Sequence, residues 1–259
     1  MRILLPPSEG KTPAISGRPV RLEEMNFTSL TAARQQVLQA LAHVSAHEDA
    51  LTRLGVGASL ASDVERNTRL LEEPAAPAHR IYSGVLYDAL GYRSLTAAGK
   101  RKADDAVVVV SGLWGAIGFA DSIPAYRLSM ATGLPGLGKL AAFWKPLLNA
   151  ALAGHVRGHL LVDCRSSTYA AAWAPDPAAT VAVNVFSERN GSRTVVSHFA
   201  KHTRGELARH LLSRRGNAPQ TPEQLLSAAK ERWTAELVPG TARRPHALNL
   251  ILPEPLSTV

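Results

Sequence analysis

The chain has 259 residues, which is long enough to bury a large hydrophobic core and short enough to form one domain. Hydrophobic residues make up 46% and charged residues 19%, which excludes a disordered or fibrous chain. The net charge of +8 favours a polyanionic partner such as nucleic acid, a nucleotide or an anionic membrane surface, with a plain solvated basic surface as an equal alternative. Between Arg193 and Arg244, ten Lys or Arg stand against four Asp or Glu, so the excess is concentrated near the C-terminus.

A single cysteine, Cys164, excludes an internal disulfide framework and a cysteine-based structural zinc site. Residues 1–7 carry too short an apolar run for a secretory signal, and no apolar stretch approaches the ~18 residues needed to span a bilayer. We therefore expect a cytoplasmic protein that does not bind membranes. No cofactor motif and no set of metal ligands can be assembled, so neither is expected. The sequence makes no prediction of the oligomeric state.

The first elements are a strand and a helical block. The apolar run from Arg2 to Leu5 predicts a strand that ends at two prolines. From Thr31 to Glu73, apolar residues at helical spacing predict two or three helices with breaks near Gly55 and Gly57. Two further helical stretches are expected, at 81–90 and 94–102.

Strands then alternate with helices. Val107 to Val110 are four β-branched residues in a row, which predicts a central strand buried on both faces. Further strands are expected at 159–162, 180–186, 193–196 and 247–252, and helices at 139–152, 199–215 and 222–236. This alternation predicts a single α/β domain, over residues 1–259, with a mainly buried sheet covered by helices. The sheet should be mixed because Asn190-Gly191 is typical of a hairpin turn.

The loop that follows the first strand, Ser8 to Thr12, contains Gly-Lys-Thr, which is typical of phosphate-cradling loops. The complete motif needs a glycine five residues before Gly10, where this chain has Leu5, and the two prolines remove backbone N–H donors. A nucleotide hydrolase is therefore not favoured. Lys11 at a strand end remains a candidate anion contact.

A glycine-rich segment follows the Val107 strand and leads to an acid, an aromatic ring and a cation within seven residues. Glycines at 112, 115 and 118 permit tight turns and close backbone approach, as in a loop that lines a site at the carboxyl end of a strand. Asp121, Tyr126 and Arg127 are therefore candidate site residues. A structural Asp–Arg pair beneath the loop is an equally weighted alternative.

The segment Leu134 to Lys139 enters a helix through two glycines and resembles the hairpin of helix-hairpin-helix DNA-binding elements. Its backbone N–H groups would face a phosphate, and Lys139 would add a charge. An ordinary glycine-rich helix entry is the alternative, and Pro146 should interrupt the second helix after a few residues.

Polar residues also follow the strand at 159–162, where they should lie at the carboxyl edge of the sheet. Ser166 is a candidate anion contact there, although it could simply cap the helix that carries Tyr169. Cys164 is a weak nucleophile candidate because no His or Asn partner can be assigned.

In the helix expected at 199–215, Arg204 falls within the apolar arc and Lys201 at its margin. A cation on an inward face needs a carboxylate, a phosphate or a wet cleft, so Arg204 and Lys201 are strong candidates for a binding site. The alternative is an internal ion pair with Asp121 or Asp163.

Taken together, these segments resemble the YaaA peroxide stress family, in its branch that opens with Pro-Pro-Ser-Glu-Gly-Lys-Thr. The matching blocks run in order along nearly the whole chain: 5–12, 82–90, 111–130, Phe143-Trp144, Ser166 with Tyr169, and 199–205. The resemblance implies a mixed α/β domain with a positively charged cleft and a helix-hairpin-helix-like element, and a role in lowering free iron and oxidative DNA damage. It also implies that Lys11, Arg127, Lys201 and Arg204 are cleft residues.

Two departures from the family pattern leave room for a chemical role: the sequence Asp163-Cys164-Arg165, and Glu9, which is negative in the opening loop. The leading hypothesis is a DNA-binding peroxide stress protein. The alternative is an enzyme that acts on a nucleotide or nucleobase, with Asp121 or Glu9 as acid/base and Lys11, Arg127 and Arg204 gripping an anion. An iron-sequestering protein ranks last because no ligands can be assembled.

Overall fold

The computed structural model describes residues 1–189, 192–195 and 197–253. In this part of the chain a mixed sheet of eight strands runs in the order β11-β12-β9-β8-β1-β3-β4, and β10 pairs with β9. The strands are β1 (Arg2–Leu5), β3 (Val107–Ser111), β4 (Gly115–Gly118), β8 (Leu161–Asp163), β9 (Thr180–Arg189), β10 (Ser192–Val195), β11 (Thr234–Val238) and β12 (His246–Leu252). The α/β class and the mixed sheet are confirmed.

The central strands are parallel and doubly buried. β12, β9, β8, β1 and β3 pair in parallel, whereas β4, β10 and β11 pair antiparallel to their neighbours. All five residues of β3 are buried, and β1 is buried from Ile3 to Leu5. Continuous apolar runs of this kind are what a sheet covered on both faces requires.

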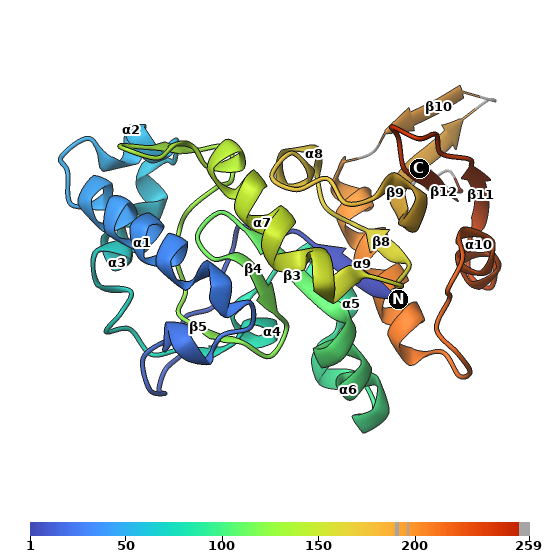
Figure 1. The fold of residues 1–259 in the computed structure, drawn as a ribbon, viewed down its shortest axis with the longest axis horizontal. Helices are drawn as coiled ribbons and strands as arrows, with labels where there is room; N and C mark the ends of the chain where they lie inside the picture. The colour runs from blue at the N-terminus through green and yellow to red at the C-terminus, as the bar shows by residue number, and fades with distance from the viewer. Residues whose placement is uncertain (190–191, 196, 254–259) are drawn as a thin grey trace, which may run out of the picture.

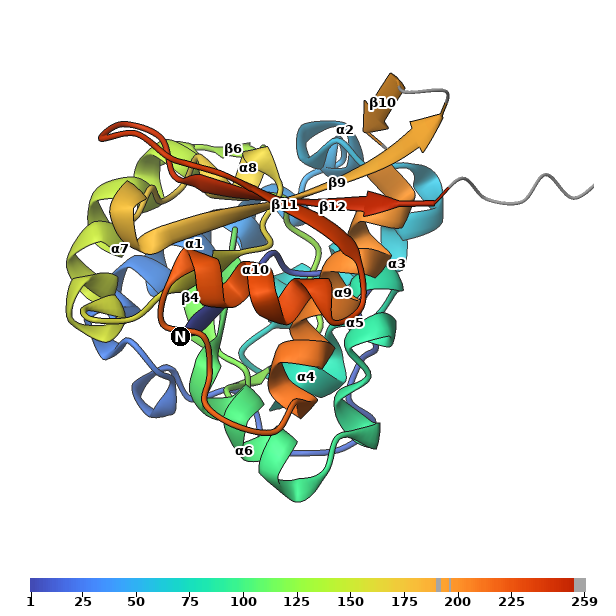
Figure 2. The same ribbon diagram turned by 90° about the vertical axis from the view of Figure 1, so that its right-hand side faces the viewer.

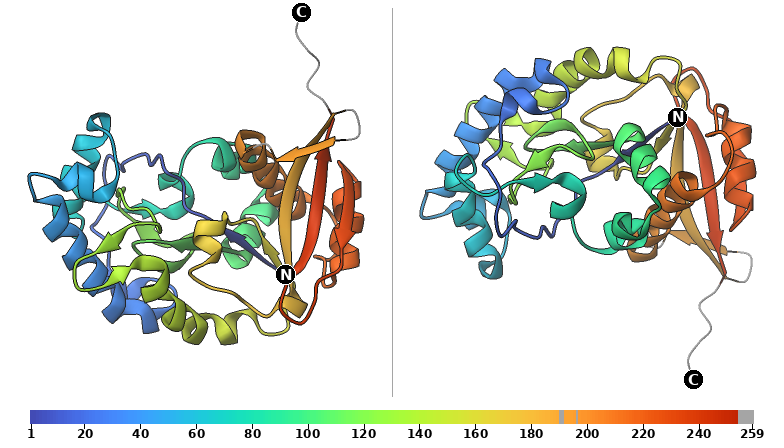
Figure 3. Two further views of the ribbon diagram at one scale, coloured as in Figure 1. Left: turned by 90° about the horizontal axis from the view of Figure 1, so that it is seen from above. Right: turned by 90° about the horizontal axis from the view of Figure 1, so that it is seen from below.

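Helices cover both faces of the sheet. α5 (Val85–Leu90), α6 (Ala97–Ala106) and α9 (Ser197–Ser213) lie on one face, and α7 (Leu140–Val156) lies on the other (Figure 3). At the β11 edge of the sheet, α10 (Pro222–Lys230) packs on β11 and contacts α9, where Nε2 of His210 lies 2.9 Å from the main-chain oxygen of Ala228 (Figure 2). The inner strands β1 and β3 are thereby removed from water on both sides.

A block of helices lies beyond the β4 edge of the sheet: α1 (Thr31–Ser45), α2 (Ala50–Leu54) and α3 (Ala61–Arg66) (Figure 1). Gly55 ends α2 with φ at 65°, as the predicted break requires. α1 is fixed to the sheet by Arg34, which is fully buried and donates to the main-chain oxygens of Trp114 and Ala116 at 3.1 and 2.8 Å. Burial lowers the pKa of Arg34 to about 10, against the opposing effect of Asp121.

Short elements connect these parts. They are α4 (Ala78–Ile81), α8 (Ser167–Ala170), β2 (Ala76–Pro77), β5 (Ser122–Ile123), β6 (Gly133–Leu134), β7 (Gly138–Lys139) and 3-10 turns at Leu22–Glu24, Thr28–Leu30, Ala58–Leu60, Asn67–Arg69, Tyr92–Ser94 and Pro177–Ala179. None of the described helices is long and apolar enough to cross a membrane.

One predicted helix is wrong at its C-terminal end. The helix expected at 222–236 stops at Lys230, and β11 begins at Thr234 and pairs with β12. The central residues of β11, Ala235 to Leu237, have good helix propensity, but pairing with a neighbouring strand overrides it. The hairpin strands β9 and β10 do pair, whereas the Asn190-Gly191 turn and Val196 lie outside the described residues.

Only part of the expected helix-hairpin-helix element is seen. β6 and β7 form a two-stranded hairpin that leads into α7, but the segment before the hairpin, residues 124–132, contains no helix. Pro146 does not interrupt α7, which continues to Val156. The interruption predicted at Pro146 is therefore wrong, since the helix tolerates the missing N–H donor at that position.

Candidate functional site

The candidate site lies where the connections of the sheet diverge. β1 lies between β8 and β3. From β1 the chain continues to β3 on one side, whereas from β8 it continues to β9 on the other. In open α/β sheets, ligands bind outside the carboxyl ends of the strands at such a switch point. The loops that follow β1, β3 and β8 therefore lie at the candidate site.

Lys11, in the loop after β1, is held mainly by main-chain oxygens. Its Nζ donates to the carbonyl oxygen of Ser8 at 2.6 Å and lies 3.4 Å from that of Glu9. The loop is fixed to the end of α4, because the N–H of Thr12 donates to the oxygen of Ile81 at 2.8 Å. The ammonium group is therefore positioned by the loop's own backbone.

Arg127 reaches the same loop from the segment after β5. Its Nη1 donates to the carbonyl oxygen of Glu9 at 3.1 Å, so it shares that acceptor with Lys11. The Arg127 backbone is clamped by Asn67, which accepts from its N–H and donates to its oxygen, both at 2.9 Å. The two cations are neighbours by construction of the fold.

Beneath Lys11 lies a buried chain of hydroxyl groups. The Lys11 Nζ is 4.3 Å from the centre of the Tyr126 ring and 5.7 Å from that of Tyr82. The two tyrosine hydroxyls lie 3.1 Å apart, and that of Tyr126 is 2.7 Å from Oγ of Ser111, at the end of β3. Burial raises the pKa of both tyrosines, so the chain stays protonated.

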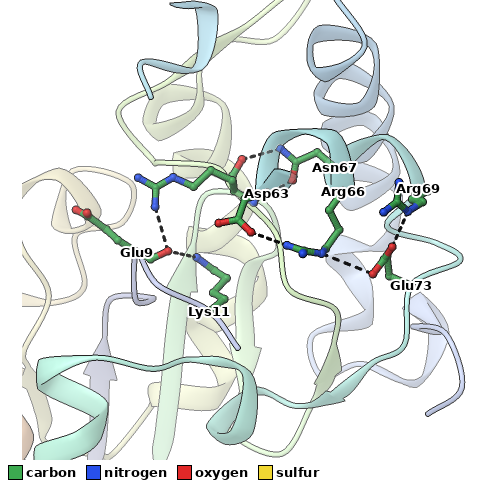
Figure 4. Close-up of polar contacts among 8 residues, drawn as sticks. Glu9, Lys11, Asp63, Arg66, Asn67, Arg69 and Glu73 are labelled. Atoms are coloured by element: carbon green, nitrogen blue, oxygen red, sulfur yellow. Dashed lines mark hydrogen bonds and ion pairs between the residues drawn. The ribbon is translucent and has the colours of Figure 1, made fainter. Parts of the chain in front are cut away.

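Acidic groups lie around this pair of cations without forming an ion pair with it. Figure 4 shows the side chain of Glu9 pointing away from Lys11, and the carboxylate of Asp63 on the other side of Lys11, where it pairs with Arg66 at 2.6 Å. Among the described residues, no carboxylate lies within 4.0 Å of the charged nitrogens of Lys11 or Arg127. Burial, with a further contribution from Arg127, lowers the pKa of Lys11 to about 7, although Asp63 and Glu9 oppose the shift.

This arrangement can bind an anion. Two cations that have main-chain acceptors but no carboxylate partner are an incomplete electrostatic group, because a buried or half-buried charge is normally paired. A phosphate or carboxylate at the shared Glu9 carbonyl edge would supply the missing negative charge. An amine with a pKa near 7 can also act as a base or a nucleophile at neutral pH.

Comparison with known proteins identifies the family of the chain. A family model described as "Peroxide stress protein YaaA" matches residues 1–236. The chain belongs to the YaaA peroxide stress family. A UPF0246 protein of Streptomyces coelicolor is 42% identical over 262 residues, covering 98% of this chain and 99% of the relative. One from Corynebacterium efficiens is 38% identical and covers 97% and 100%, and one from Cereibacter sphaeroides is 34% identical and covers 73% and 72%.

Within this family member, the structure places Asp121 in a supporting role. Asp121 is 6% exposed, and its carboxylate accepts from the N–H of Gly118 at 2.9 Å and from Nδ2 of Asn26 at 2.6 Å. The backbone N–H of Asn26 adds a further donor at 3.1 Å. A carboxylate held by several donors inside a turn stabilises the fold and is poorly suited to move protons.

The two cations of α9 do not share one environment. Arg204 is part-buried, as the apolar arc predicts, but its guanidinium donates to the main-chain oxygen of Val183 on β9 at 2.7 and 3.1 Å. Lys201, which the sequence places at the margin of the apolar arc, is exposed. Neither Asp121 nor Asp163 pairs with Arg204: Asp163 instead pairs with Arg165 at 2.7 Å.

The remaining candidates either make no contact with Lys11 or Arg127 that the structure records, or are unreactive because they are buried. Lys139 is exposed on the β7 hairpin, and exposed Ser166 occupies the N-cap of α8 without a side-chain cap bond. Cys164 is fully buried, and burial raises its pKa to about 12, so it is not a nucleophile at neutral pH. Tyr126 is 2% exposed and meets Lys11, so its ring does not face solvent.

Sequence reasoning missed three residues of the site: Tyr82, Asn67 and Asp63. Tyr82 lies directly after α4 and forms a β-bridge with Lys11, and Asn67 holds the backbone of Arg127. Asp63, in α3, acts on Lys11 only through its charge. Tyr82 had the clearest signal, because it stands directly before the Ser83-Gly84 turn within a block that resembles the family. No group of three His, Cys, Asp or Glu in the described part of the chain could hold a metal ion.

Proposed function

We propose that this protein acts in the peroxide stress response by binding DNA, with a backbone phosphate seated between Lys11 and Arg127. The observation that carries the proposal is that these two cations converge on one carbonyl oxygen at the switch point of the sheet without a carboxylate partner. Phosphate contacts supply most of the affinity of DNA-binding proteins, and they favour such preorganised cations.

The charge of the chain supports a polyanionic ligand. The net charge is +8, and much of the excess lies between Arg193 and Arg244. A field of this sign attracts DNA from solution and speeds association at low salt. The proposal includes the positively charged cleft that the family resemblance implies.

A second phosphate contact is proposed at the β6–β7 hairpin. Gly136 and Gly138 have φ of 75° and 68°, which turns the backbone sharply before α7, and Lys139 is exposed beside them. Backbone N–H groups at such a turn, next to a helix N-terminus, favour anions. This hairpin would act as the DNA-binding half of a helix-hairpin-helix-like element.

The proposed role under peroxide is protection of DNA and limitation of damage driven by free iron. It is tested in cells by deleting the gene and restoring it as wild type or as Lys11→Ala. Restoration of peroxide survival by wild type, but not by the variant, supports the proposal. Equal restoration of peroxide survival by wild type and Lys11→Ala would show that the function does not require the Lys11 site.

The binding step is tested by fluorescence anisotropy with a labelled duplex at low salt. Lys11→Ala and Arg127→Ala should each weaken binding by about 5- to 10-fold, since a charged contact contributes about 1–1.5 kcal/mol. The matched control is Lys230→Ala, which removes an exposed lysine at the end of α10. Equal affinity of all four proteins contradicts the proposal.

An enzyme that acts on a nucleotide or nucleobase is the second candidate, and the lowered pKa of Lys11 favours it. Glu9 is then the acid/base, since it is exposed beside Lys11 whereas Asp121 is fully hydrogen-bonded. Mononucleotides that displace the duplex, together with a turnover that Glu9→Gln abolishes, would support this function. Duplex binding that no mononucleotide disturbs would exclude it.

A further inference from the structure

Lys11 combines features that a DNA contact alone does not require. A lysine that only grips phosphate works best when it is fully charged and solvated at its tip. Here the Nζ lies against two aromatic rings and two main-chain oxygens, and burial lowers its pKa to about 7. The neutral amine is therefore accessible at neutral pH, whereas an ordinary lysine has a pKa of about 10.4.

The surroundings show why the amine is neutral so readily. The Tyr126 face at 4.3 Å and the Ser8 oxygen at 2.6 Å both favour the charged form. Desolvation and the neighbouring Arg127 oppose them and prevail. The Ser8 oxygen also orients one N–H, which limits the nitrogen lone pair to the two remaining tetrahedral positions.

We propose that the Lys11 amine forms a Schiff base with the aldehyde carbon of an open-chain sugar that carries a phosphate, and that Arg127 holds this phosphate. The open-chain sugar phosphate can come from an abasic site in DNA, and for this source the inference rests on the proposed function. A free sugar phosphate offers the same chemistry. Arg127 and Lys11 share the Glu9 oxygen, so a phosphate and a carbonyl a few bonds apart can reach both.

The reaction balances without an oxidant or reductant. The Lys11 nitrogen attacks the aldehyde carbon, and the C=O electron pair moves to oxygen, which takes up a proton from the amine through solvent. The resulting carbinolamine loses its hydroxyl as water with the second amine proton. The product is an imine, C=N, and one molecule of water.

The sheet supports this step by keeping the amine fixed. Ser111, Tyr126 and Tyr82 form a buried hydroxyl chain below Lys11, and burial keeps both tyrosines protonated. Protonated phenols present a neutral face, so they do not form a full ion pair with the lysine. A carboxylate in their place would raise the pKa of Lys11 and keep the amine protonated, so that it could not act as a nucleophile.

The experiment traps the imine by reduction. The full-length protein is incubated at pH 7 with a duplex that carries one abasic site and with sodium cyanoborohydride, which reduces C=N to a stable secondary amine. The covalent adduct is measured on a denaturing gel and located by peptide mass mapping. We expect the adduct on Lys11 and a yield at least 10-fold above that of Lys11→Arg.

Controls separate chemistry from binding. A duplex with a tetrahydrofuran site has no aldehyde and should bind without being trapped. Lys230→Ala should be trapped like wild type. Peptide mapping locates the adduct on the wild-type protein itself, so the result does not depend on correct folding of Lys11→Arg. An adduct spread over other lysines, or equal yields from wild type and Lys11→Arg, overturns the inference.

A second arm uses free 2-deoxyribose 5-phosphate and reads the mass of the Lys11 peptide. Trapping of the sugar phosphate without DNA binding supports the Schiff base and contradicts the DNA function. DNA binding without trapping in either arm overturns the Schiff base and leaves the DNA function standing. Trapping of abasic DNA that Arg127→Ala weakens at least 5-fold supports both.

Discussion

The ammonium nitrogen of Lys11 lies 4.3 Å from the centre of the Tyr126 ring. This contact joins the loop after β1 to the hydroxyl chain that ends at Ser111 on β3, and Arg127 follows Tyr126 directly in the chain. The geometry of the candidate site is therefore set by neighbouring parallel strands, and it carries positive charge that the described part of the chain does not pair with a carboxylate.

The pH dependence of stability should reveal the neutral amine of Lys11. Its folded pKa, about 7, is lowered from 10.5, so between these values the unfolded chain binds more protons than the folded one. The free energy of unfolding of wild type should therefore rise relative to Lys11→Met as the pH increases from 7 to 10, by at most about 1.4 kcal/mol per pH unit.

The measurement is urea unfolding of both proteins at pH 6.5, 8 and 9.5. Taking the difference between them cancels the tyrosines and other groups that titrate in both. A difference that does not change with pH would show that Lys11 keeps an ordinary pKa.

Gly205 should resist a substitution that normally stabilises helices. A Cβ added to Gly205 of α9 would stand 2.1 Å from the carbonyl oxygen of Leu86 in α5, so Gly205→Ala forces the two helices apart. We expect a loss of about 1–3 kcal/mol of stability. Gly154→Ala in α7 is the matched control, because nothing lies within 4 Å of its Cβ, and it should gain about 0.5–1 kcal/mol.

Thermal or urea unfolding of the two variants gives the comparison. A Gly205→Ala variant that is as stable as Gly154→Ala would contradict the close approach of α5 and α9.

Arg204 should matter for stability and not for DNA affinity. Its guanidinium satisfies the Val183 oxygen on β9, so Arg204→Ala leaves that part-buried acceptor without its partner and should cost about 1–3 kcal/mol. Duplex affinity of the folded variant should equal that of wild type. A large loss of affinity at unchanged stability would return Arg204 to the binding site that the sequence predicts for it.

Cys164 should be unreactive in the folded protein. It is fully buried and its pKa is raised to about 12. Because the thiolate is the reactive form, alkylation by iodoacetamide at pH 8 should be at least about 100-fold slower than in urea-unfolded protein. Comparable rates in the two states would reopen its role as a nucleophile.

The strands of the sheet could be predicted wherever burial decides the residue type. β1 and β3 are apolar runs because both faces are covered, whereas β9 buries the alternate residues Val181, Val183 and Val185, and the positions of these strands match the predictions. β11 could not be predicted, since Thr234–Val238 becomes a strand through pairing with β12. β4 is short and flanked by glycines, and its identity depends on pairing with β3.

The site was predictable in part for the same reason. Lys11 and Arg127 stand after strand-like runs or in glycine-rich loops, so their types and places point to an anion. The role of Asp121 was not predictable, because its partner Asn26 is 95 residues away in sequence. The burial of Arg34 could have been predicted, since Arg34 shares the apolar stripe of α1 with Leu38 and Leu41. The same argument identified Arg204 as inward-facing.

The most direct test of the central claim is the salt dependence of duplex affinity for wild type and for the double variant Lys11→Ala/Arg127→Ala. Each phosphate contact contributes about 0.9 to the slope of log affinity against log salt concentration. If Lys11 and Arg127 seat a phosphate, the slope of the double variant should be shallower by about 1, with weaker binding at low salt. Identical slopes and affinities would show that DNA, if bound at all, binds elsewhere on the molecule.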